Sequence, residues 1–205
     1  AHVLWGRCWE AGGAPAYWPW VQALRSYVRE CDPDKLRSQL AAGIQDLAHL
    51  LPDLRERFPD VPELHDLESE GARFRLFDAV AAFLRNASEE APLVLVLDDL
   101  HVADAPSLLM LQFVAAEIAD ARVTLLAIYR DPDPERGEDE DEDARLTDLG
   151  RAASVRSALG GLSESDVVAY VRSTAAVDPP RTVVDAIVRE TEGNPLFVGE
   201  VVRLL

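Results

Sequence analysis

Apolar residues at helical spacing predict several amphipathic helices along the chain. In WPWVQALRSYVREC they recur at intervals of three and four residues, and Pro19 suits the first turn of a helix. The stretch DKLRSQLAAGIQDLAHLL predicts one helix that ends at Pro52, and further helices are expected over residues 68–85 and 106–119. Residues 53–67 are rich in proline and predict a loop.

Other apolar stretches are short enough to be strands. Residues 2–7 form the first, residues 93–97 the second, and RVTLLAIYR, residues 122–130, the third. The second and third lack alternation between apolar and polar positions, which is typical of parallel strands covered on both faces. Because helices alternate with these strands, the sequence predicts an α/β fold with a parallel sheet flanked by helices.

Charge dominates the next part of the chain. Residues 131–143, DPDPERGEDEDED, contain no apolar anchor, and we expect a solvated loop there rather than an acidic ligand or metal site. The stretch SVRSALGGL, residues 154–162, predicts a short strand.

Three short amphipathic helices follow, in SESDVVAYVRSTA, PRTVVDAIVRETEG and PLFVGEVVRLL. Ser163, with Asp166 three residues later, forms a variant of the capping box that starts a helix. We therefore expect an α/β core over residues 1–161 and a small helical subdomain over residues 162–205.

Composition narrows the function classes. The formal net charge of −17 argues against nucleic-acid binding, which needs clustered basic residues. No apolar run is long enough to span a bilayer. Cys8 and Cys31 follow no metal-ligand spacing, and no secretory signal is present, so we expect a reduced, cytoplasmic setting. The four histidines are scattered along the chain, and their spacing predicts no metal site.

The apolar run LVLVL ends on two adjacent carboxylates, Asp98 and Asp99. In an open parallel sheet, ligands bind beyond the carboxyl ends of the strands. Two carboxylates there are costly unless a cation or hydrogen-bond donors compensate them. One interpretation is an acidic helix-capping turn, because Asp104 and Ser107 follow in cap-like positions. The other is a Walker B element, in which one carboxylate holds Mg²⁺ and the next orients the attacking water.

An ordered set of motifs surrounds this pair. VLWGRCWEAGGAPAYWPWVQALR, VLVLDDLHVADAPSLLMLQFVA, LLAIYRD, GLSESDVVAYV and TEGNPLFVGEVVRLL resemble the signal-transduction ATPases with numerous domains. The resemblance is to the AAA-type ATPase module of LuxR-type transcriptional regulators and of related adenylate-cyclase-associated or kinase-associated regulators. It covers the whole chain and implies a P-loop NTPase-like parallel sheet followed by a helical lid, with ATP and Mg²⁺ as ligands.

The resemblance also implies roles for particular residues. Asp98 matches the carboxylate associated with Mg²⁺, and Asp99 matches the one that polarises the attacking water. Arg130 matches a sensor-like arginine near the γ-phosphate, although it also fits a surface arginine paired with Asp131. The role of His101 stays open, because the chain has valine where the family's DDLHWAD pattern has tryptophan.

The motif of Gly193, Asn194 and Pro195 matches the turn of the family's helical lid, where the proline borders the adenine pocket. Local chemistry offers a second explanation, with glycine ending one helix and proline opening the next. The two explanations are compatible.

The sequence contains no phosphate-binding loop of the form GxxxxGK[ST]. The one lysine in the chain, Lys35, has no glycine nearby. The resemblance puts this loop upstream of residue 1, so we expect a fragment that lacks the first strand, the P-loop and the first helix. The expected strand order is then the His2 region, the Leu93 region, the Val123 region, an open position and the Val155 region.

Three functions remain in view. The first is an ATPase regulatory switch in the parent protein, with the fragment itself inactive. The second is a degenerate, non-hydrolysing scaffold for protein contact, and the third is an unrelated α/β interaction domain whose aspartates only cap helices. Expected partners are ATP and the other domains of the same polypeptide. Self-association stays open, and no direct contact with nucleic acid or membrane is expected.

Overall fold

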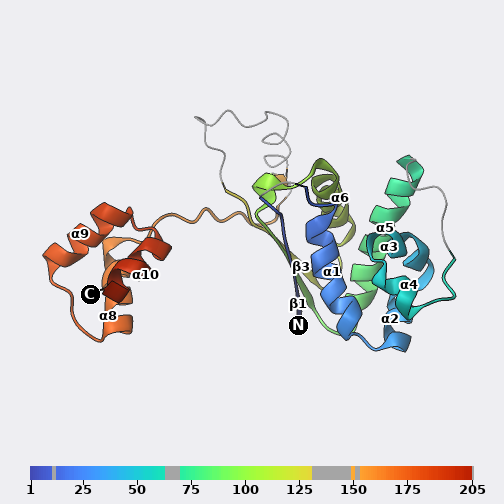
Figure 1. Ribbon diagram of the computed structural model, residues 1–205, viewed down its shortest axis with the longest axis horizontal. Coiled ribbons are helices and arrows are strands. Elements are labelled where there is room, and N and C mark those ends of the chain that lie inside the picture. The colour runs from blue at the N-terminus through green and yellow to red at the C-terminus, as the bar shows by residue number, and fades with distance from the viewer. Residues whose placement is uncertain (11–12, 63–69, 131–148, 151–152, 205) are drawn as a thin grey trace. The chain divides into compact units, whose positions relative to one another are not determined.

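The structure of the protein is a computed structural model, shown in Figure 1. The part of the chain that it describes comprises residues 1–10, 13–62, 70–130, 149–150 and 153–204. The chain divides into two compact units, Ala1–Ala152 and Ala153–Leu205. The acidic stretch 131–143, predicted as a solvated loop, lies outside the described residues.

A parallel sheet organises the first unit. Its strands are β1 (His2–Arg7), β2 (Leu93–Asp98) and β3 (Val123–Ala127), in the order β1-β2-β3. The register aligns the first residues of all three strands, so the strands also end at a common edge. The predicted order of these segments and the predicted parallel α/β fold are confirmed.

Helices α1 (Trp18–Glu30), α5 (Glu70–Ser88) and α6 (Ala105–Glu117) pack on one side of the sheet, as Figure 1 shows. The side chains of Leu4 and Leu95 point toward this layer and are almost fully buried. Trp20 is the largest fully buried side chain, and its Nε1 donates a hydrogen bond to the backbone oxygen of Ser107 at 3.2 Å. This contact links α1 to α6 through the interior.

The segment between α1 and α5 is more divided than predicted. It contains α2 (Pro33–Leu40), the short 3₁₀ helix Ala41–Gly43, α3 (Ile44–Leu50) and α4 (Asp53–Arg57). The prediction of one helix was wrong because Ala41 has a φ of 46°, which no continuous α-helix allows. The predicted loop was also wrong over α4, where the fully buried Leu54 anchors a helical turn; residues 63–67 of that loop lie outside the described residues.

Coverage of the sheet differs between its strands. Strand β2 lies between β1 and β3 and is buried along most of its length. The prediction of a strand covered on both faces was wrong for β3, where Leu126 is 46% exposed. In β1, Trp5 lies on the same face of the sheet and is 53% exposed. The reason is that β3 has no described partner on its outer edge and no described helix over this face.

The second unit is a small helical cluster. It consists of α8 (Glu164–Ala175), α9 (Arg181–Thr191) and α10 (Pro195–Leu204), packed around a valine-rich core. The predicted capping box at Ser163 is confirmed, because its side chain and that of Asp166 each accept from the other's backbone N–H.

No helix in the described residues is long and apolar enough to cross a membrane.

The predicted strand near Val155 is absent from the described residues, where 153–160 carry no strand. The side chain of Val155 is 84% exposed. A strand is stabilised by its hydrogen-bonded neighbour, and no described strand pairs with this segment. The apolar character of SVRSALGGL was therefore insufficient evidence for a strand.

The contact between β1 and α1 gives a stability prediction. A Cβ added at Gly6 would lie 1.8 Å from the carbonyl oxygen of Pro19, so G6A forces two backbone segments apart. We expect it to destabilise the first unit by about 3 kcal/mol. The matched control is G160A, because nothing lies within 4 Å of the added Cβ there. Urea unfolding followed by tryptophan fluorescence tests this, since all four tryptophans lie in residues 5–20. Equal unfolding midpoints for the two variants would contradict it.

Candidate functional site

Backbone hydrogen bonds extend the strand pairing past the ends of the strands. The amide of Cys8 donates to the carbonyl of Asp98 at 3.0 Å, and the amide of Ile128 donates to Leu97 at 2.9 Å. The amide of Leu100 in turn donates to Ile128 at 3.0 Å. The three segments that leave the carboxyl edge of the sheet are therefore held in register with one another.

Asp98 and Asp99 both lie at this edge. Asp99 has a φ of 56°, in the left-handed region, and its amide donates to Asp98 Oδ1 at 2.9 Å. The Nε of Arg7, the last residue of β1, donates to Asp99 Oδ2 at 2.5 Å. The hydrogen bond and the charge of Asp99 raise the pKa of Arg7. Because the Asp99 side chain is only 12% exposed, this guanidinium compensates a largely buried carboxylate.

The aspartate that caps a helix here is Asp104, not Asp99. Asp104 precedes α6, and its side chain accepts from the amide of Ser107 at 2.9 Å and from the Ser107 hydroxyl at 2.6 Å. Asp99 precedes the 3₁₀ helix Leu100–Val102, and its side chain makes no capping hydrogen bond. The capping alternative therefore describes Asp104 and does not explain Asp99.

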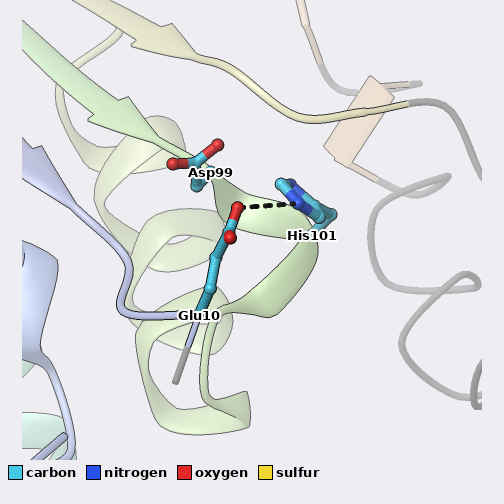
Figure 2. Close-up of side chains that lie close together, drawn as sticks. All are labelled: Glu10, Asp99 and His101. Atoms are coloured by element: carbon cyan, nitrogen blue, oxygen red, sulfur yellow. Dashed lines mark ion pairs between the residues drawn. The ribbon is translucent and has the colours of Figure 1, made fainter. Parts of the chain in front are cut away.

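Arg130, after β3, reaches the same edge through Glu10, after β1. Its Nη2 donates to Glu10 Oε1 at 3.2 Å, and the Nε2 of His101 lies 4.0 Å from the same oxygen. The alternative partner of Arg130, Asp131, lies outside the described residues. Figure 2 shows Glu10 and His101 pointing toward one another, with Asp99 beside them. One ligand atom from each of these three side chains lies within 4.8 Å of the others.

Sequence reasoning missed Arg7 and Glu10. Both lie in the motif VLWGRCWEAGGAPAYWPWVQALR, but the resemblance assigned neither residue a role, and their partners are distant in the sequence, with Arg7 and Asp99 separated by 92 positions. A signal was nevertheless available, because residues 2–7 were predicted as a parallel strand. Polar residues at the end of such a strand gather at the same edge as those following its neighbours.

The negative charge at this edge is concentrated enough to affect a neighbouring thiol. Burial is the main cause that raises the pKa of Cys8 to about 12, and the charges of Asp104, Asp99 and Asp98 add to it. A cavity of about 260 Å³ opens beside this thiol, between Trp9, Trp18 and Asp104.

A larger cavity lies among the helices. It has a volume of about 410 Å³ and is lined in part by Tyr17, Asp46, His49 and Arg73. None of the site residues predicted from the sequence, namely Asp98, Asp99, Arg130, Gly193, Asn194 and Pro195, lines this cavity.

The motif of Gly193, Asn194 and Pro195 lies in the second unit, between α9 and α10. Gly193 has a φ of 72°, and its carbonyl accepts from the amide of Leu162 at 2.7 Å. The Oδ1 of Asn194 accepts from the amide of Leu196 at 3.0 Å, and Pro195 is the first residue of α10. The proline that opens the next helix is confirmed, whereas the C-cap of α9 is Glu192, with Gly193 directly after it.

Comparison with known proteins adds the decisive observation. The family model described as the AAA ATPase domain matches residues 1–128, more than half of the chain. The chain belongs to the AAA ATPase domain family. The parallel sheet flanked by helices is accordingly the P-loop NTPase-like arrangement that the sequence predicted. Searches of curated proteins and of solved structures found no match.

The matched part of the AAA ATPase domain contains Arg7, Glu10, Asp98, Asp99 and His101, and it ends before Arg130. Membership makes ATP and Mg²⁺ plausible ligands, because domains of this family generally bind both. Membership of this family confirms the predicted resemblance to an AAA-type ATPase module. The closer relation to LuxR-type regulators stays a prediction, as do the roles of the individual residues and the division into a core and a lid at residue 161.

The turn at Gly193 gives a second stability prediction. A Cβ there would lie 2.3 Å from the carbonyl oxygen of Leu162 in a left-handed conformation that L-residues disfavour. We expect G193A to destabilise the second unit by about 3 kcal/mol. The control G199A places its Cβ 3.2 Å from the Tyr170 hydroxyl, which can move. Hydrogen exchange at the amides of α9 and α10 measures the effect, and equal protection in both variants would refute it.

Proposed function

We propose that this chain supplies the Walker B, sensor and lid elements of an ATP-binding and ATP-hydrolysing switch module. The module would belong to a larger, cytoplasmic signalling or transcriptional regulator of the LuxR type. One observation carries the proposal. In a chain of the AAA ATPase domain family, Asp98 and Asp99 lie at the carboxyl edge of the parallel sheet. That is where an open α/β sheet binds its ligand.

Asp98 suits a role as the carboxylate associated with Mg²⁺. It is partly exposed, and its Oδ1 is oriented by the amide of Asp99. An ionised carboxylate has lone pairs on both oxygens, so Oδ2 can accept a ligand or a metal-bound water. When bound, Mg²⁺ supplies positive charge to the β- and γ-phosphate oxygens.

Asp99 suits a role in orienting and polarising the attacking water. Its side chain is held by Arg7 and largely shielded from solvent, so its oxygens have a defined position. A water at Asp99 Oδ1 would donate to this carboxylate while facing the edge of the sheet. Arg7 is in this view a positioning residue, which acts on the reaction through Asp99.

Arg130 suits the role of a sensor for the γ-phosphate. Its guanidinium pairs with Glu10 at 3.2 Å and is 67% exposed, so a phosphate could compete for it. Arginine binds phosphate strongly through paired N–H donors. Contact with the γ-phosphate would then require Arg130 to exchange one anionic partner for another.

The second unit would serve as the lid. Gly193, Asn194 and Pro195 form a hydrogen-bonded turn at the start of α10, and by resemblance the proline would border the adenine. ATP would tie the lid to the α/β layer through Arg130 and Pro195, and slow hydrolysis would reset the switch. The other domains of the same polypeptide would be the partners that respond, with no direct role in nucleic-acid or membrane contact.

A second candidate function is a non-hydrolysing scaffold of the same fold. The observation that favours it is the lack of a GxxxxGK[ST] motif in this sequence. The ATPase proposal needs that loop from another part of the polypeptide. A full-length polypeptide without one would favour the scaffold.

The isolated chain should therefore bind Mg-ATP very weakly and hydrolyse none. Without P-loop amides and their lysine, the phosphates lack most of their ligands. Isothermal titration calorimetry on residues 1–205 measures this, with a longer polypeptide that includes a P-loop as the positive control. Micromolar affinity of the isolated chain would contradict the prediction.

In a polypeptide that joins this chain to a P-loop, D98A should lower Mg-dependent ATP turnover by about a hundredfold or more. D99N should lower kcat to a similar extent while ATP affinity stays within about threefold, because Asp99 would act on the water rather than on binding. The control is D120N, an exposed aspartate after α6. Phosphate release over a range of ATP concentrations gives kcat and KM, and an unchanged rate in D98A would end the assignment.

A further inference from the structure

We propose that Glu10, Asp99 and His101 bind a divalent first-row transition-metal ion, separately from the Mg²⁺ that would accompany a nucleotide. The site would share Asp99 with the proposed function but requires neither a nucleotide nor a P-loop. Its three side chains come from the segments that follow β1 and β2 at the carboxyl edge of the sheet, as Figure 2 shows.

Geometry is the first support for this site. One ligand atom from each of the three side chains lies within 4.8 Å of the others, and Glu10 Oε1 lies 4.0 Å from His101 Nε2. Ligand atoms about 2.1 Å from a common ion lie roughly 3 to 3.5 Å from one another. A pair of ligand atoms 4.8 Å apart would therefore need to close by roughly 1.3 to 1.8 Å, and the pair at 4.0 Å by roughly 0.5 to 1 Å. Glu10 can supply that movement, because its side chain is half-exposed.

His101 provides a second, independent support. Its side chain is only 15% exposed, yet within the described part of the chain its buried Nδ1 has no hydrogen-bond partner. Its Nε2 faces Glu10 at a distance beyond hydrogen-bonding range. Leaving an imidazole in such a place is costly unless another ligand satisfies it. Coordination through Nδ1 would satisfy this buried atom directly, and coordination through Nε2 would give the ring a ligand on the side that faces Glu10.

The local charge balance also favours a cation. The carboxylates Glu10, Asp98 and Asp99 outnumber the guanidiniums of Arg7 and Arg130 at this edge. Arg7 contacts Asp99 Oδ2, and Arg130 contacts Glu10 Oε1. The latter oxygen also lies 4.0 Å from His101 Nε2. A carboxylate accepts at both oxygens, so a metal ion would bind Asp99 Oδ1 and would either use Glu10 Oε2 or displace Arg130 from Oε1.

The ligand set indicates the class of ion. One imidazole nitrogen with two carboxylate oxygens suits zinc, iron, cobalt or manganese. Mg²⁺ and Ca²⁺ prefer oxygen ligands alone. Selectivity for transition metals over Mg²⁺ is thus a direct consequence of including His101.

Titration of the chain with Co²⁺ in the absence of nucleotide tests the proposal, because the visible absorption of Co²⁺ reports nitrogen ligation and coordination number. We expect a saturable band with one Co²⁺ per chain, displaced by Zn²⁺ and not by the same concentration of Mg²⁺. H101N and E10Q should each weaken binding about tenfold or more. The matched controls H2A, at the opposite end of β1, and E30Q, at the end of α1, should bind Co²⁺ like the original chain.

Any Co²⁺ bound through oxygen alone by the acidic residues 131–143 would be the same in these variants, because they leave that stretch unchanged. Circular dichroism and urea unfolding check that each variant folds, and the half-exposed position of Glu10 makes E10Q the safer of the two tests. The proposal is overturned if no saturable band forms, or if folded E10Q binds Co²⁺ as tightly as E30Q. ATP turnover in the longer polypeptide is measured separately. A missing Co²⁺ site with intact turnover would overturn this inference and leave the proposed function standing.

Discussion

The parallel backbone pairing of β1, β2 and β3 is the constraint on which the candidate site depends. Hydrogen bonds from Cys8 to Asp98, from Ile128 to Leu97 and from Leu100 to Ile128 continue this pairing beyond the strands. These hydrogen bonds fix the positions at which the segments after the strands begin. Polar side chains from three distant parts of the chain consequently meet at one edge, while apolar side chains occupy the strands behind them.

Carboxylate side chains at this edge form ion pairs with arginines. Arg7 compensates Asp99, whose side chain is largely buried, and Arg130 pairs with Glu10, whose side chain is half-exposed. The pair of Arg130 and Glu10 contributes little to stability, because water screens it. A phosphate or a metal ion could therefore replace one partner of this pair without loss of the fold. The same negative charges act on the Cys8 thiol, and burial, the main cause of its raised pKa, keeps this thiol protonated.

Structural explanations account for Gly193 in the second unit but not for Asp99 in the first. Asp104 caps a helix, which leaves Asp99 with no capping role and makes a functional explanation of that residue stronger. At Gly193 the left-handed backbone and the contact with Leu162 fully explain the glycine on structural grounds. A lid function would then use a turn whose conformation has a local cause. Membership of the AAA ATPase domain family covers residues 1–128 and so bears on the first unit alone.

The sequence by itself determined the features that local chemistry encodes. These include the three strands, the placement of Asp98 and Asp99 at a strand end, and the cap at Ser163, because each follows from side-chain periodicity or from contacts within a few residues. Only the tertiary structure decided that Arg7 holds Asp99, that Glu10 lies between Arg130 and His101, and that one face of β3 is exposed. The physical reason is that such contacts depend on which strands become neighbours, and hydrogen bonds between distant segments set that choice.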